Sequence, residues 1–192
     1  MSENNKTGVK RITMSMKSKD EIVSLILNNK DEFKDYRAEN GGIIDLSECD
    51  FAAGDISDID FSNIDFSGAS FAECSLTNVN FTGCDLTSAN FSRANVSECD
   101  FSESVLNGTD FSYSSVTYSN FTDADMAGCV LNEAELSDSD FSASANMSAC
   151  RFDEGTIWPD SDKLPEDFDS TYNYDLSSLQ DEEDTRGEDF GY

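Results

Sequence analysis

Residues 81–101 read FTGCDLTSANFSRANVSECDF, and every fifth residue of this stretch is apolar. The same spacing continues in both directions, so that all 20 such positions from residue 46 to residue 141 are apolar. They are Leu46, Phe51, Ile56, Phe61, Phe66, Phe71, Leu76, Phe81, Leu86, Phe91, Val96, Phe101, Leu106, Phe111, Val116, Phe121, Met126, Leu131, Leu136 and Phe141. A helix repeats every 3.6 residues and a strand every two, so neither keeps each fifth residue on one side. The spacing therefore predicts a chain that turns a corner every five residues.

The residues around each apolar position are restricted as well. Two positions earlier the side chain is mostly small, as at Cys84, Ala89 and Ala94, which indicates a second inward position with little room. Asp, Asn or Ser separates the two inward positions in most repeats, and Ser, Thr or Ala usually follows the large residue. Short polar side chains of this kind bond to nearby backbone in turns.

Over residues 43–158 this pattern resembles the pentapeptide-repeat family. The resemblance implies an all-β solenoid, a right-handed quadrilateral β-helix with one pentapeptide on each face and 20 residues in each coil. Phe recurs at every tenth residue from 51 to 121 and again at 141, which predicts two phenylalanine columns that face each other across the interior. Residues 43–152 would make five to six coils, a rod about 26 Å long at the ~4.8 Å spacing of paired strands.

The series slips by one residue after Phe141. Asn146 occupies the expected apolar position, and Met147 and Phe152 resume the spacing. An extra residue in one strand makes a bulge, so we expect a distorted corner near residues 142–147.

The flanking segments divide the chain into four parts: a basic N-terminal arm (1–17), an α-helical cap (18–42), the β-helix (43–158) and an acidic, aromatic tail (159–192). Ser18 and Glu21 fit a capping box, and we expect helices over about 19–29 and 31–38. Such a cap would cover the exposed edge of the first coil. At the other end, we expect Ile157 and Trp158 to close the last coil and Pro159 to end the pairing.

The charge and the missing residue types narrow the function. Lys and Arg number 12 and Asp and Glu number 40, and the net charge of −28 opposes direct binding to nucleic acid or to an anionic membrane. The chain has no histidine, no Gly-rich phosphate loop and no Ser/His/Asp set, so we expect a protein that is not an enzyme, with no catalytic residue, cofactor or metal.

The cysteines and the apolar segments bear on the compartment. All six cysteines fall at the small inward position once the slip is applied, which predicts buried, reduced thiols. No segment suits a membrane span or a secretory signal. We expect a cytoplasmic location, in a host cell, or in a virion if the protein is a phage component.

With 20 residues in each coil, the outward acids fall into columns. One column holds Asp45, Asp65, Asp85 and Asp125, interrupted by Val105; another holds Asp60, Asp100 and Asp140, with Asn80 and Asn120 between them. Residues 43–152 carry 19 acids against Arg93 and Arg151, a net charge of −17. Over the predicted rod this is about one charge per 1.5 Å, close to the ~1.7 Å of duplex DNA. The columns are therefore candidate contacts for a protein with a basic surface or a nucleic-acid-binding cleft.

Two functions remain open. The first is a DNA mimic or decoy that inhibits a DNA-binding enzyme, in a phage or defence conflict. Acidic family members that inhibit DNA gyrase in this way are similar in charge, but they dimerise through an apolar C-terminal helix that the tail after Pro165 does not resemble. The oligomeric state therefore stays open.

The alternative is a structural or assembly protein, such as a phage virion component or scaffold, in which the rod is a rigid spacer. Its docking segments would be the basic arm and the aromatic tail. The candidate contacts in these segments are Lys10, Arg11, Lys17, Phe168, Tyr172 and Tyr174.

Overall fold

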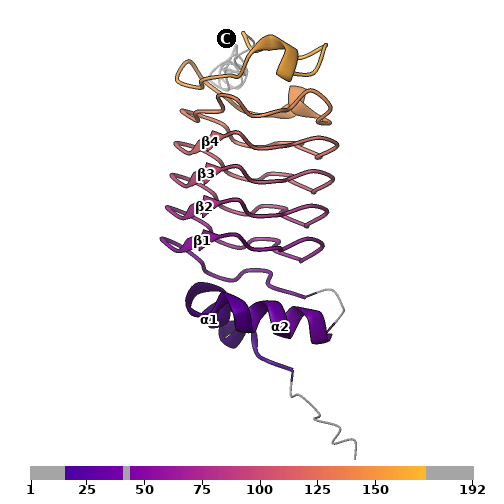
Figure 1. Ribbon diagram of the computed structural model, residues 1–192. Helices are drawn as coiled ribbons and strands as arrows, with labels where there is room; N and C mark the ends of the chain where they lie inside the picture. Colours follow the sequence, from indigo (N-terminus) through magenta and orange to yellow (C-terminus); the bar gives the residue numbers. More distant parts are fainter. Residues whose placement is uncertain (1–15, 41–43, 172–192) are drawn as a thin grey trace, which may run out of the picture.

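Stacked coils of chain form a rod, and two helices cover its N-terminal end (Figure 1). The computed structural model describes residues 16–40 and 44–171. Within these ranges no helix is both long and apolar enough to cross a bilayer. The architecture is the quadrilateral β-helix that the family resemblance implies, with the expected helical cap.

The cap consists of α1 (Lys19–Asn28) and α2 (Lys30–Asn40), within one or two residues of the predicted bounds. Ser18 and Glu21 form the predicted capping box: each side chain accepts a hydrogen bond from the backbone N–H of the other. The helices bury Ile26 and Phe33, and the Phe33 ring lies 5.8 Å from that of Phe61 in the first coil. The two helices thus extend the apolar interior beyond the end of the coils.

One face of the rod is a parallel sheet of short strands in the order β1 (Asp55–Ser57), β2 (Ser75–Thr77), β3 (Asn95–Ser97) and β4 (Ser115–Thr117). Residues 20 apart pair in this sheet, as Ile56 does with Leu76. The other three faces pair through single bridges with the same step, for example Asp65 with Asp85. The predicted coil length of 20 residues is therefore confirmed.

From Leu46 to Leu136, corners between faces are made by a residue in the left-handed region, two positions after each large apolar residue. Glu103 (φ 57°) and Tyr113 (φ 59°) are examples, and Gly83 (φ 65°) fills an equivalent corner without a side chain. For residues other than glycine this conformation costs roughly 1–2 kcal/mol. Backbone hydrogen bonds to the next coil hold it, such as Glu103 N–H to the Thr122 carbonyl (3.0 Å).

The interior contains the two predicted phenylalanine columns. Within a column the rings stack, as between Phe81 and Phe101 (centroids 4.9 Å apart, 7° between planes). Across the interior they meet edge to face, as between Phe91 and Phe101 (5.9 Å, 81°). Both arrangements are favourable for aromatic quadrupoles, so the columns support each other along the rod.

All six cysteines are buried and unpaired with one another, as predicted. Several donate to a carbonyl of the preceding coil; Cys84 Sγ, for example, lies 3.0 Å from the Phe61 oxygen. Burial raises the pKa of the Cys84 thiol to about 12 and that of Cys74 to about 11. The cysteines therefore act as small interior residues.

The register slip is also confirmed. The pairing step is 20 residues for Asp125 with Ala145 and 21 for Val130 with Arg151. Between them, Asn146 adopts a left-handed conformation (φ 60°) and leads into a 3₁₀ turn, η1 (Met147–Ala149). The extra residue therefore sits on the outside of the rod, which leaves the interior series intact.

The C-terminal end differs from the prediction in two respects. Ile157 pairs with Glu135 through its backbone, but its side chain is 55% exposed, because a second inserted residue brings Thr156 into the buried position. Pairing also continues past Pro159: the Phe141 N–H donates to the carbonyl of Lys163 (2.8 Å), in the 3₁₀ turn η2 (Ser161–Lys163). Phe141 needs only a carbonyl acceptor, which Lys163 supplies. The N–H that Pro159 lacks is therefore not needed for the pairing to continue.

Trp158 covers the C-terminal end of the rod, as expected. It packs there against Phe168, a residue of the predicted tail. Its ring lies 5.1 Å from that of Phe152 and 4.9 Å from that of Phe168. Phe168 is therefore part of the C-terminal cap, and the ordered packing extends about ten residues beyond the boundary predicted at residue 158.

Candidate functional site on two acidic faces

Both predicted acidic columns form. Bridges connect Asp45, Asp65, Asp85, Val105 and Asp125 in sequence along one face. On the neighbouring face, bridges connect Asp60, Asn80, Asp100, Asn120 and Asp140. We call these the Asp45 column and the Asp60 column.

Each carboxylate in these columns takes part in a local turn. The Oδ1 atom of Asp65 accepts the N–H of Ser67 (2.9 Å), and that of Asp85 accepts the N–H of Thr87 (3.0 Å). Asn80 makes the same bond to Thr82 (2.9 Å) through its amide oxygen. The turn therefore uses a side-chain oxygen where one is present, and it does not require a charge.

Sequence reasoning missed a second set of acids, at two left-handed corners: the corner between these two faces and the corner that precedes the Asp60 face. Their signal is an acidic residue two positions after the large apolar one, and the corner residues stack in the same 20-residue step, as Asn78 Nδ2 does on Asp58 Oδ1 (2.8 Å). Together with the two columns they make twelve acids, which we call the acidic surface: Asp45, Asp58, Asp60, Asp65, Asp85, Glu98, Asp100, Glu103, Asp123, Asp125, Asp138 and Asp140. No Lys or Arg occupies any position of these columns.

The remaining two faces are less acidic. These faces and the corners beside them carry the other seven acids of the coils together with Arg93 and Arg151. The exposed Tyr113 (60%) lies here, and the Arg93 guanidinium is 5.6 Å from its ring, whereas the exposed Tyr118 (64%) stands in the same corner column as Asp58 and Glu98. The rod thus has one strongly anionic side and one of mixed character.

The two columns hold their charges differently. In the Asp60 column, acids alternate with amides: Asn80 Nδ2 donates to Asp60 Oδ1 and Asn120 Nδ2 to Asp100 Oδ1, both at 3.1 Å. In the Asp45 column, acids stand on three consecutive coils with no amide between them. Repulsion between stacked carboxylates is thus relieved in one column and retained in the other.

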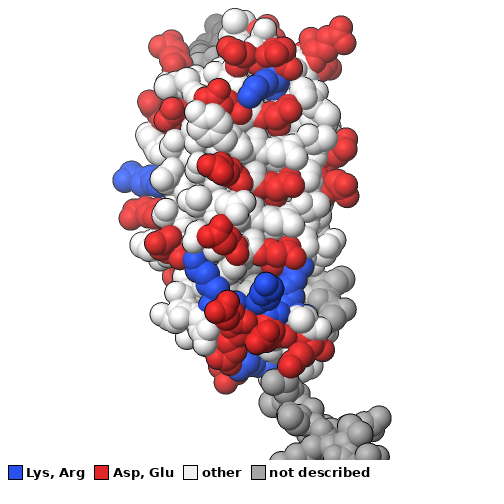
Figure 2. Space-filling model, in the orientation of Figure 1, with Lys and Arg blue, Asp and Glu red and all other residues white. Residues whose placement is uncertain are grey.

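Cations of the cap neutralise the N-terminal end of both columns. Lys19 Nζ lies 2.6 Å from Asp45 Oδ1, and this hydrogen bond, with those from Ser47, lowers the pKa of Asp45 to about 2. Arg37 lies 3.7 Å from Asp60. Figure 2 shows Lys and Arg gathered at the helical end, with Asp and Glu repeated along the rod beyond it. The uncompensated part of the Asp45 column therefore begins at Asp65.

The candidate docking residues are only partly placed. Lys17 pairs with Glu32 of α2 (3.4 Å), and Phe168 packs in the C-terminal cap. Lys10, Arg11, Tyr172 and Tyr174 lie outside the described residues. Among residues 16–40 and 44–171, no group of three His, Cys, Asp or Glu side chains is arranged to hold a metal ion.

Comparisons with known proteins agree with this repeat architecture. A family model described as "pentapeptide repeat region" matches residues 44–111 and 74–157, which together exceed half of the chain. No curated protein sequence gives a significant match.

Three solved structures similar to this chain differ in sequence identity, coverage and TM-score. A pentapeptide repeat protein (Rfr23) from the cyanobacterium Cyanothece 51142 is 18% identical, with 64% of this chain and 95% of that chain covered and a TM-score of 0.40. A pentapeptide repeat protein from Nostoc is 30% identical, with 55% of this chain and 77% of that chain covered and a TM-score of 0.31. QnrB1, a plasmid-mediated fluoroquinolone resistance protein, is 17% identical, covering 57% and 80%, with a TM-score of 0.23. On the family match and its own repeat geometry, this chain belongs to the pentapeptide-repeat family.

Proposed function

We propose that the protein is a non-enzymatic DNA mimic, whose acidic surface occupies the nucleic-acid-binding cleft of a DNA-binding enzyme and inhibits it. The observation that carries this proposal is the Asp45 column. Asp65 and Asp85 stand on consecutive coils in it, their charges are not needed by the turns and repel each other, and no cation among the described residues pairs with either. Charges that cost stability and serve no turn are expected where a partner uses them.

The density of charge suits such a partner. Twelve acids over about five coils of ~4.8 Å give one charge per ~2 Å, against ~1.7 Å for duplex DNA. All of them lie on two adjacent faces, so a cleft lined by Lys and Arg would meet them from one side. Electrostatic complementarity of this kind raises the association rate and makes binding sensitive to salt.

The proposal is tested by competition with DNA. A labelled duplex is bound to each of several purified DNA-binding enzymes (topoisomerases, nucleases and polymerases), and its displacement by the protein is measured at low and high salt. The test variant replaces Asp65, Asp85, Asp100 and Asp125 by Asn, which retains the turn oxygen. The matched control removes four charges from the other two faces: Asp55→Asn, Asp110→Asn, Glu133→Gln and Glu135→Gln.

We expect displacement from at least one enzyme, weakened tenfold or more in the test variant and by less than twofold in the control. The salt dependence of binding should also become shallower in the test variant, because fewer cations of the partner are neutralised. Equal losses in the two variants would show that total charge, and not the acidic surface, governs binding. If no enzyme releases its duplex, the spacer function is favoured.

A further inference from the structure

Cations of the cap close the N-terminal edge of the first coil on three of its four faces. The nitrogen-to-carbonyl contacts join Lys19 to Ser47 (2.9 Å), Lys30 to Ser57 (3.1 Å) and Arg37 to Ser62 (2.6 Å). Each cation also bonds the hydroxyl of the same serine. In later coils the carbonyl at this position accepts a backbone N–H from the preceding coil, so these cations replace a coil that is missing.

The fourth face is different, because residue 52 is Ala and offers no hydroxyl. Among the described residues no donor reaches the Ala52 carbonyl, whereas the equivalent carbonyl of Ala72 accepts the Ala53 N–H (2.8 Å). The N–H and carbonyl of Asp50 are also unpaired within this part of the chain, although Ser70, one coil later, uses both. One donor and two acceptors in line form a template for an added strand.

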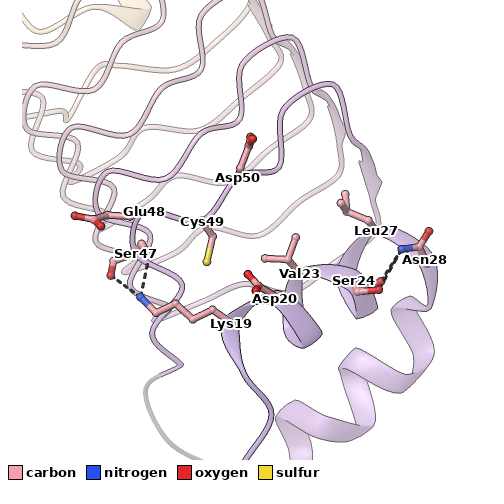
Figure 3. A pocket seen from close by; sticks show the side chains of 10 residues that line it. All are labelled: Lys19, Asp20, Val23, Ser24, Leu27, Asn28, Ser47, Glu48, Cys49 and Asp50. Carbon is pink, nitrogen blue, oxygen red and sulfur yellow. Dashed lines mark hydrogen bonds between the residues drawn. The ribbon is translucent and has the colours of Figure 1, made fainter.

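A groove of about 660 Å³ lies beside this open edge, between α1 and the first coil (Figure 3). Lys19 and Ser47 bound one end. Leu27 bounds the other, where it approaches so closely that a Cβ at Gly54 would lie 2.8 Å from its Cδ2 atom. The ten residues of α1 span about 15 Å, which matches four to five residues of extended chain.

The lining of the groove indicates what would bind there. Val23 and Leu27 supply an apolar floor, and the sulfur of Cys49 points into the space (Figure 3). Three acids, Asp20, Glu48 and Asp50, also line it. The one cation of the lining, Lys19, is already bonded to Asp45 and Ser47. The groove therefore suits an extended segment that combines cationic and apolar side chains.

From these features we infer that the groove binds the basic segment at residues 6–12 of the chain's own N-terminal arm, through backbone hydrogen bonds to Asp50 and Ala52. This segment, KTGVKRI, carries three cations and two aliphatic side chains, and it lies outside the described residues. Its charge complements the three acids of the groove.

The length of the arm is sufficient. Fifteen residues precede Met16 and reach up to about 50 Å when extended. Met16 and Lys17 lie on the opposite side of α1, near Tyr36 and Asn40, and a helix is only ~10–12 Å across. Because the segment is tethered, its effective concentration at the groove is in the millimolar range, so modest contacts suffice.

Cross-linking in the full-length chain tests the inference. Val9→Cys places a thiol in the segment, and Ser24→Cys places an exposed thiol on α1 where it lines the groove. A short bismaleimide should join residues 9 and 24 within one chain, as mapped by peptide mass. The rate should fall at least fivefold when Glu48→Gln and Asp50→Asn are added, and it should be unchanged with the matched pair Glu103→Gln and Asp110→Asn, which lies further along the rod.

A second measurement needs neither introduced cysteine. Hydrogen exchange of the Asp50 amide should be at least tenfold slower in the wild-type chain than in Lys10→Glu/Arg11→Glu, because the segment then no longer supplies an acceptor. Cross-links between two chains would assign the groove to a second copy and overturn the inference. Equal cross-linking in all backgrounds, or an Asp50 amide that exchanges at the same rate in both proteins, would overturn it as well.

Discussion

The two acidic columns lie on neighbouring faces of one rod and use the same turn, but they differ in what separates their carboxylates along the rod. In the Asp60 column each amide bonds an acid on the coil before it, so the column is a hydrogen-bonded ladder. In the Asp45 column, Asp65 and Asp85 follow Asp45 directly, and within residues 16–40 and 44–171 only Asp45 of the three has a cationic partner. Two unit charges ~4.8 Å apart repel by about 0.9 kcal/mol in water, so this stacking opposes folding.

The difference separates what the fold needs from what it tolerates. Val105 and Ala145 occupy the Asp45 column without disturbing its pairing, so a carboxylate there is not a structural requirement. The Asp60 column can be explained by its own hydrogen bonds. In the Asp45 column, Asp125 accepts from Asn146 and Asp45 from Lys19, but Asp65 and Asp85 have no such partner among the described residues, and they are therefore the better candidates for a partner contact.

The largest expected effects come from the interior beneath the two columns. Phe101, under the Asp60 column, stacks on both Phe81 and Phe121, and Phe101→Ala should lower the free energy of unfolding by about 3–5 kcal/mol. Leu106 is buried in the aliphatic column under the Asp45 column, and Leu106→Ile keeps the side-chain volume, so it should cost less than about 1.5 kcal/mol. Urea unfolding measures both, and a loss for Phe101→Ala as small as that for Leu106→Ile would contradict the predicted packing of the interior.

Exchanging acid and amide should act with opposite signs in the two columns. Asn80→Asp removes the bond to Asp60 and places three carboxylates on consecutive coils, so it should destabilise by about 1 kcal/mol at low salt. Asp85→Asn relieves the repulsion from Asp65 and keeps the turn, so it should stabilise by about 0.5 kcal/mol. Thermal unfolding in low and 1 M salt measures the pair; the same sign for both substitutions would contradict the comparison.

The smallest effect concerns the one compensated member of the Asp45 column. Because Lys19 and Ser47 lower the pKa of Asp45 from 3.8 to about 2, its contribution is fully present above pH 4 and is lost as the pH falls through 2. The pair is exposed, so the wild type should exceed Asp45→Asn by at most about 1 kcal/mol at pH 5, and the two should converge near pH 2. A difference that stays constant between pH 5 and 2 would show that the ion pair is not its source.

Much of the site follows from the sequence, because a solenoid converts spacing along the chain into position in space. A step of five assigns each residue to a face, and a step of 20 assigns it to a column. The membership of both columns, the phenylalanine ladders and the slip at Asn146 were therefore predictable. The corner acids followed the same period and were missed only because the left-handed position had not been recognised as outward.

The ends of the rod were decided by tertiary structure, since there the repeat stops and contacts join segments that no period relates. The pairing of Lys19 with Asp45, the exposure of Ile157 and the packing of Phe168 on Trp158 all arise where a coil lacks a neighbour. Backbone groups at such an edge form hydrogen bonds with the side chains of the cap that lie close to them. The sequence alone thus determined the columns, and only the folded chain decided which of their charges are neutralised and which edge the described residues leave unpaired, at Ala52.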